Sequence, residues 1–191
     1  MNVYFSGYFG VSTDALEEYG AFNISLINDL PVFIDPFLLF NSDKDEYQNL
    51  HNQIIKYITF LREMSERGKI NEGLIKHWFL FPEVKQNWLG FSKVGNSGSG
   101  LGAKFAYAMN NNLATIFTDF GAETVTKGSH LEKLCLIKDS VGKDNISDFT
   151  TNLIKGYLCE FTEPFAIKHI AKSRLKSIRV SHAEFDYDTR R

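Results

Sequence analysis

The sequence predicts an α+β domain in which a small mixed or antiparallel sheet packs against about six helices. Aromatic and alternating apolar residues near the N-terminus are typical of strands. Longer stretches with an apolar residue every three or four positions are typical of amphipathic helices. The chain has 191 residues, of which 43% are hydrophobic and 23% are charged, as in ordinary globular domains. We therefore expect a single domain over residues 1–191.

Three segments are predicted to form the sheet. Residues 2–11 are rich in aromatic residues, which favour strands. Residues 21–35 contain alternating apolar residues on both sides of a turn-prone Asn28-Asp29 pair, and this pattern indicates a hairpin. Residues 175–185 carry Ile and Val two positions apart and are predicted to be the closing strand.

Helical periodicity accounts for most of the remaining chain. The clearest stripe lies in residues 43–67, with Gly68 expected just past the helix end. Pro164 is expected to end one helix and to lie in the first turn of the next, because proline interrupts a helix interior. The predicted helices span residues 43–67, 71–80, 101–109, 129–138, 148–161 and 163–172.

The stretch 139–163 holds the first candidate site. Gly142 is expected to form a tight turn with positive φ, followed by possible N-cap residues and by Asp148 at the start of a helix. Asp144 and Asp148 could be an acidic helix start, which the helix dipole favours. They could also be ligands of Mg²⁺ or Mn²⁺, because hard cations prefer carboxylate oxygens. A metal site usually needs a third ligand from elsewhere in the chain.

Three further residues are candidates for catalysis. Asp35 precedes Pro36 at a predicted strand end, and Glu83-Val84-Lys85 is an acid-x-Lys triplet. Nucleases of the PD-(D/E)xK type use such residues to bind a metal and to position the attacking water. Each feature also has an explanation without catalysis. An Asp-Pro pair is a common turn, and a triplet of this kind is expected by chance in a chain with this many acids and lysines.

A glycine-rich loop in residues 90–104 is the second candidate site. Backbone amides of such loops can face an anion, and a helix start favours negative charge. The loop lacks the Walker A pattern, so a flexible surface loop is the alternative interpretation. The residues predicted to bind phosphate are Lys93, Gly95, Gly98, Gly100, Gly102 and Lys104.

Composition and charge exclude several classes of protein. The net charge of −2 gives no overall basic field, so contact with nucleic acid would require a local patch. Cys135 and Cys159 lie in apolar patterns and read as buried thiols, which fits a reducing cytosol. The N-terminus does not resemble a signal peptide, and no apolar run is long enough to span a membrane. We therefore expect a cytoplasmic protein.

Parts of the sequence resemble an uncharacterised bacterial family. The resemblance is carried by LINDLPVFIDPFLLF, WLGFSKVGNSGSGLGAKFA and HLEKLCLIKDSVGKDNISDFTTNLI. Members of that family include longer proteins, some of them found among mobile-element or phage-defence genes. The resemblance implies that the two polar loops are family features and that this chain is the front module of a larger protein. It assigns no catalytic residue.

Two functions follow as hypotheses. The first is a metal-dependent nuclease or phosphodiesterase-like domain, which needs carboxylates around a dry cleft. The second is a non-catalytic binding or sensor module that docks nucleic acid, a partner protein or a C-terminal module. Hydrolysis by Ser or Cys is weaker, because no GxSxG elbow is present. Convergence of Asp35, Glu83, Asp144 and Asp148 in space would favour the enzyme.

Overall fold

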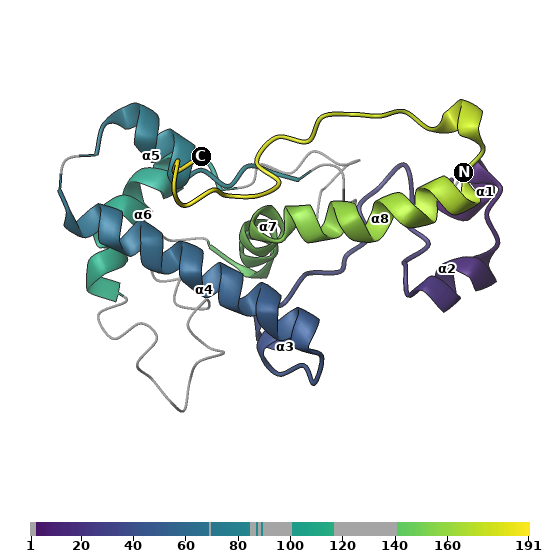
Figure 1. The fold of residues 1–191 in the computed structure, drawn as a ribbon, viewed down its shortest axis with the longest axis horizontal. Helices are drawn as coiled ribbons and strands as arrows, with labels where there is room; N and C mark the ends of the chain where they lie inside the picture. The colour runs from purple at the N-terminus through teal and green to yellow at the C-terminus, as the bar shows by residue number, and fades with distance from the viewer. Residues whose placement is uncertain (1–2, 69, 85–86, 88, 90–100, 117–140) are drawn as a thin grey trace. The chain divides into compact units, whose positions relative to one another are not determined.

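The structure is a computed structural model of the 191-residue chain, and it describes residues 3–68, 70–84, 87, 89, 101–116 and 141–191. Within these residues the chain forms eight α-helices and a 3₁₀ helix, η2 (Figure 1). The helices are α1 (Phe5–Phe9), α2 (Thr13–Tyr19), α3 (Pro36–Phe40), α4 (Asp45–Glu66), α5 (Glu72–Trp78), α6 (Ala103–Ile116), α7 (Lys143–Leu153), α8 (Lys155–His169) and η2 (Lys172–Arg174).

The predicted α+β class was wrong, because the described part of the chain is helical and holds no sheet. Its β-type pairing is limited to three isolated bridges. An isolated bridge joins one residue pair only, so no ladder develops along the chain. The bridged pairs are Tyr4–Ser25, Leu30–Leu89 and Phe81–Leu101.

Each of the three predicted strands has another structure. Residues 2–11 contain α1, in which Phe5 and Phe9 pack against each other one turn apart, with ring centroids 4.7 Å apart. Gly10 ends this helix in the left-handed region, with φ +71°. Residues 21–35 do not form a hairpin, and residues 175–185 have no regular secondary structure. Aromatic content and alternation favour strands only where a partner strand completes the ladder.

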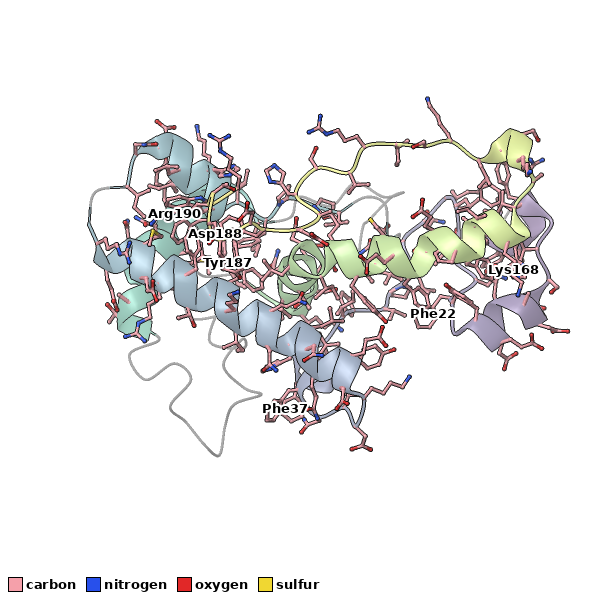
Figure 2. All side chains as sticks on the ribbon, in the orientation of Figure 1. Phe22, Phe37, Lys168, Tyr187, Asp188 and Arg190 are labelled. Carbon is pink, nitrogen blue, oxygen red and sulfur yellow. The ribbon has the colours of Figure 1, made fainter. Side chains whose placement is uncertain are left out.

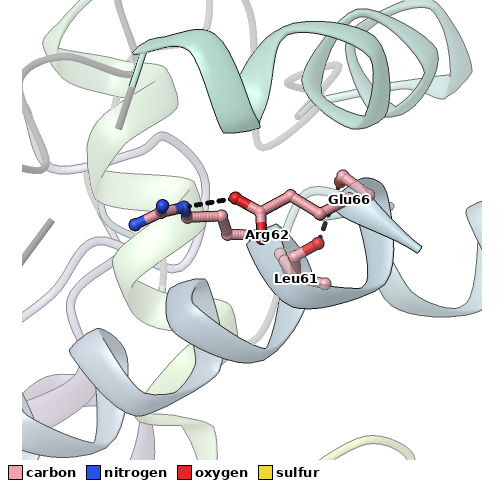
Figure 3. A network of polar contacts seen from close by, with 4 residues as sticks. Leu61, Arg62 and Glu66 are labelled. Atoms are coloured by element: carbon pink, nitrogen blue, oxygen red, sulfur yellow. Dashed lines mark hydrogen bonds and ion pairs between the residues drawn. The ribbon is translucent and has the colours of Figure 1, made fainter. Parts of the chain in front are cut away.

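Two helices were predicted correctly, and both belong to the best periodic patterns. α4 occupies almost all of residues 43–67, and Gly68 follows it with φ +88°. α5 lies within residues 71–80. The exposed side of α4 carries an i,i+4 ion pair, with 2.9 Å between Arg62 Nε and Glu66 Oε1 (Figure 3).

The other helical predictions need correction. α6 continues through the Asn110–Asn112 run, where an end was expected, to Ile116. The predicted helix 148–161 is divided, because α7 ends at Leu153 and α8 begins at Lys155. The predicted helix 129–138 lies outside the described residues. No separate helix begins at Glu163, since α8 is continuous to His169.

Pro164 lies inside α8 although proline removes one helix hydrogen bond and costs about 3 kcal/mol in a helix interior. The carbonyl that loses its partner belongs to Glu160, which is exposed. Phe161 and Phe165 lie on both sides of the proline, and each packs against Tyr19 with a ring centroid distance of 4.8 Å. This aromatic packing stabilises the helix on both sides of the proline and offsets its penalty.

The chain divides into two compact units. The central unit comprises the described residues of 33–84 and 99–153, and the terminal unit comprises those of 1–32, 85–98 and 154–191. Each has its own buried core, and each is described separately below.

The core of the central unit is built on α4. This helix packs against α3, α6 and α7, and α5 packs against α6. The fully buried residues include Ile54, Ile58 and Leu61 of α4 together with Met109 of α6 and Phe149 of α7. The Tyr57 hydroxyl donates a 2.8 Å hydrogen bond to the Trp78 carbonyl oxygen and ties α4 to the end of α5.

The core of the terminal unit is smaller and aromatic. Val11, Leu16 and Phe165 are its buried centre. Partly buried residues of α1, α2 and the end of α8 pack around them. The Tyr19 hydroxyl donates a 2.6 Å hydrogen bond to the carbonyl oxygen of Phe161, so α2 is held against α8. This core fixes the C-terminal end of α8, from which the candidate site described below extends.

Candidate nucleic-acid interface

α7 holds the two carboxylates that were predicted to bind metal. The helix begins at Lys143, so Asp144 lies in its first turn and Asp148 lies one turn further on. Residues four apart on a helix are neighbours on one face, with about 5–6 Å between Cβ atoms. Asp148 is only 5% exposed and Asp144 is half-buried. Two expectations were wrong: Asp148 is not in the first turn, and Gly142 does not have positive φ.

The segments around Asp35 and Glu83 lie beside α7. The Ile34 amide donates a 2.8 Å hydrogen bond to Ser147 Oγ, and the Asn152 side chain donates one of 2.7 Å to the carbonyl oxygen of Pro82. The Asp35 carboxylate caps α3 by accepting a 2.9 Å hydrogen bond from the amide of Phe37.

Of the five residues predicted to be catalytic, the structure describes all but Lys85. Among the described residues, no three His, Cys, Asp or Glu side chains are grouped closely enough to hold a metal ion. What the structure does bring together is the pair Asp144 and Asp148 on one helix face.

Of the glycine-rich loop, only the end is described. Gly102 precedes α6, and its carbonyl oxygen accepts hydrogen bonds from the amides of Phe105 (3.0 Å) and Ala106 (3.1 Å). Lys104 is exposed in the first turn of α6. The other predicted phosphate-binding residues, Lys93, Gly95, Gly98 and Gly100, lie outside the described residues.

A cluster of cations at the end of the terminal unit was not predicted. Five of the 21 Lys and Arg residues, and none of the 23 Asp and Glu residues, lie between Glu163 and Glu184. All five are exposed, and Figure 2 shows the first of them at the C-terminal end of α8. We call them the basic strip: Lys168, Lys172, Arg174, Lys176 and Arg179.

The cations of the basic strip form no ion pair with the acidic residues that the structure describes. Three ion pairs among the described residues join side chains four positions apart on α4, at its C-terminal end, and on α5. The positive charge of the strip is therefore available to an external anion.

Residues 175–183, which we call the strap, carry the last two members of the strip, Lys176 and Arg179. At the strap's beginning, Arg174 Nη1 donates a hydrogen bond to the Tyr8 carbonyl oxygen, and its guanidinium lies 5.1 Å from the centroid of the Tyr8 ring. At the strap's end, the Gly156 amide donates a 2.9 Å hydrogen bond to the Ala183 carbonyl oxygen. The strap thus returns from the end of α8 to its beginning and is attached at both places (Figure 1).

The last residues close on themselves beyond the strap. The amides of Asp186 and Arg191 donate to each other's carbonyl oxygens, at 2.7 and 3.1 Å. Asp186 accepts further hydrogen bonds from the Thr189 hydroxyl (2.8 Å) and from the Asp188 amide (2.9 Å). These hydrogen bonds lower the pKa of Asp186 below its usual value. The bond from the Thr189 hydroxyl has the largest effect, and those from the backbone amides of Asp188 and Thr189 add to it. This carboxylate stays ionised at neutral pH and belongs to a structural turn.

Sequence reasoning missed the strip because it considered charge over the whole chain. A net charge of −2 conceals a twenty-residue segment that contains five cations and no acid. Counting charges in a sliding window would have found it, since blocks of like charge indicate interaction surfaces.

The chain was compared with known proteins in three ways. No curated protein and no solved structure matches it. Among the described helices, none combines the length and the apolarity that crossing a bilayer requires. A family model described as a domain of unknown function, DUF8370, matches residues 10–191, which include the central unit, the basic strip and the terminal unit from Gly10 onward. The chain therefore belongs to the DUF8370 family.

Proposed function

We propose that this protein is a non-catalytic helical module that binds nucleic acid through the basic strip. The observation that carries the proposal is the presence of five exposed cations in a segment without acidic residues. Lys and Arg bind phosphates and release the counterions condensed on the nucleic acid, which supplies most of the sequence-independent affinity. A module of this kind would suit the mobile-element or phage-defence genes among which some members of the resembled family are found.

The positions of the predicted catalytic residues agree with a binding role. Asp35 already caps α3, and Asp144 and Asp148 form a pair to which the described residues add no third acidic or imidazole ligand. Metal-assisted hydrolysis needs several such ligands around the reacting phosphate. The nuclease thus stays a second hypothesis, with the Asp144–Asp148 pair as its centre.

Neutralising the strip is expected to weaken binding to nucleic acid strongly. We would replace Lys172, Lys176 and Arg179 by Gln and measure fluorescence anisotropy of a labelled oligonucleotide at several salt concentrations. Arg174 is left unchanged because it also holds the strap to Tyr8. For a single strand, each lost phosphate contact lowers the slope of log K against log salt by about 0.7, so the triple variant should lose about 2.

The matched control removes three exposed cations from the central unit. Lys44, Arg67 and Lys76 are exposed and lie on or beside α4 and α5, so their replacement by Gln changes net charge equally. The control should keep the affinity and the salt slope of the unchanged protein. Equal losses of affinity in both variants would show that only net charge matters, and would overturn the proposed role of the basic strip.

Divalent metal is expected to leave the stability of the protein unchanged. A ligand that binds only the folded state raises the melting temperature by mass action. We would record melting curves with and without millimolar Mn²⁺ or Mg²⁺, and would assay cleavage of the same oligonucleotide. A metal-dependent rise that disappears in the Asp144→Asn, Asp148→Asn variant would instead support the nuclease hypothesis.

A further inference from the structure

We infer that the ligand of the basic strip is single-stranded nucleic acid, and this inference rests on the proposed function. It is carried by the form of the strap and by the apolar side chains exposed among its cations. Both are properties of the terminal unit alone.

The strap holds two of the cations, Lys176 and Arg179, on a segment without regular secondary structure. Leu175, the first residue of the strap, has extended backbone angles, with φ −84° and ψ 138°. Arg174 and Ala183 are nine positions apart in the sequence, and an extended chain of that length can span about 30 Å. The return path along α8, from Ile170 to Gly156, is about 21 Å at 1.5 Å per residue. The strap is therefore long enough to return along the helix, and its two attachments hold its ends (Figure 1).

Large apolar side chains are exposed beside these cations. Ile178 lies between Lys176 and Arg179 and is 64% exposed, and Ile167, next to Lys168, is also 64% exposed. Tyr8 is 54% exposed, although the Arg174 guanidinium lies over one face of its ring. A ligand that binds the strip must cover these side chains or leave them in water.

A single strand meets both requirements. Its phosphates can contact successive cations, and its unstacked bases can stack on an aromatic ring or cover apolar side chains. Aromatic residues beside a basic groove are the usual composition of such sites. In a duplex the bases are stacked and paired, so Tyr8 and Ile178 would face only sugar and phosphate.

Other polyanions fit the strip less well. Proteins that read duplex DNA place a helix or a two-stranded ribbon in the major groove, whereas the strap is one irregular segment. An anionic membrane binds basic amphipathic helices with a broad apolar face. Here the cations beyond Lys168 lie on η2 and the strap, and the apolar face of α8 near its end is already packed on α1 and α2.

The test compares three ligands with the unchanged protein at one salt concentration. They are a labelled mixed-sequence single strand of about twelve nucleotides, the duplex of the same sequence, and vesicles of phosphatidylcholine and phosphatidylserine. The single strand should bind at least about tenfold more tightly than the duplex. The vesicles should not compete with it.

Variants of Tyr8 and Ile178 test whether the bases of the bound strand cover these exposed side chains. Tyr8→Ala should weaken single-strand binding by about 5- to 100-fold, with little change for the duplex, because it removes a stacking surface. Tyr8→Phe keeps the ring and the backbone carbonyl oxygen that Arg174 contacts, so it should restore binding. Ile178→Ser lies on the strap outside the buried core and repeats the test if Tyr8→Ala disturbs α1.

The outcomes separate the two proposals. Equal affinity for single strand and duplex, with the expected loss in the triple Gln variant, would overturn the single-strand inference and keep the proposed function. Normal single-strand binding by both Tyr8→Ala and Ile178→Ser would do the same. Absence of any oligonucleotide binding, or stronger binding to the vesicles, would overturn the proposed function itself.

Discussion

Replacement of Phe149 by Ala is expected to lower the free energy of unfolding by about 3–5 kcal/mol. Phe149 is completely buried in α7, and its ring centroid lies 4.4 Å from that of Phe81. Removing the ring takes away both its burial and its contacts, and the surrounding helices can close the cavity only in part. This packing, together with the hydrogen bonds made by Ser147 and Asn152, joins α7 to the rest of the central unit.

Urea unfolding followed by circular dichroism measures this effect. Leu38→Ala is the matched control, since Leu38 lies in α3 of the same unit and is 66% exposed. Its change in unfolding free energy should stay within about 0.5 kcal/mol. A loss below about 1 kcal/mol for Phe149→Ala would contradict the packing of α7 against the residues around Phe81.

The sequence predicted best those elements whose stability comes from local patterns. α4 has an apolar stripe over six turns and ends at a left-handed glycine, so its periodicity and its stop signal agree. α5 has an Asn71 cap, whose side chain accepts a 2.9 Å hydrogen bond from the Leu74 amide. In both cases the information lies within a few residues of the element itself.

Predictions failed where distant packing decides the conformation. Nothing local shows that Phe5 and Phe9 pack against each other within a helix, or that Tyr19 packs on both sides of Pro164. Tertiary contacts override strand propensity and the usual exclusion of proline from helices. The three predicted strands and the expected break at Pro164 were wrong for this reason.

The candidate site also combines features set by local sequence with features set by distant contacts. The sequence predicted a helix that begins at Asp148, whereas α7 begins at Lys143 and holds both Asp144 and Asp148. The path of the strap, however, depends on contacts between Arg174 and Tyr8 and between Ala183 and Gly156, which lie far apart in the sequence. No pattern within residues 175–185 could show that this segment is an attached strap instead of a strand.

Gly156→Ala is the change expected to affect the strap most. Gly156 lies in the first turn of α8, where Ala would favour the helix by up to about 1 kcal/mol. A Cβ atom there, however, would lie 2.9 Å from the Ala183 carbonyl oxygen and 3.2 Å from Glu184 Cγ. The carbonyl oxygen belongs to the backbone and cannot turn aside as a side chain would, so the strap itself must move.

Two losses then oppose the gain in helix propensity. Forcing an extra carbon into a packed contact costs about 1–3 kcal/mol. Displacing Ala183 also breaks its hydrogen bond with the Gly156 amide, which is worth about 0.5–1.5 kcal/mol. We therefore expect Gly156→Ala to detach the end of the strap and to destabilise the terminal unit by about 1–2 kcal/mol.

Hydrogen exchange of residues 175–185 and affinity for the single-stranded oligonucleotide measure the two consequences. Exchange should become faster, and affinity should fall because the cations of the strap are no longer held in place. Gly7→Ala is the matched control, since Gly7 lies in α1 with no atom within 4 Å of the added carbon. That variant should keep or slightly raise stability and leave exchange of the strap unchanged. A Gly156→Ala protein with normal exchange and higher stability would show that the strap is not attached at Ala183.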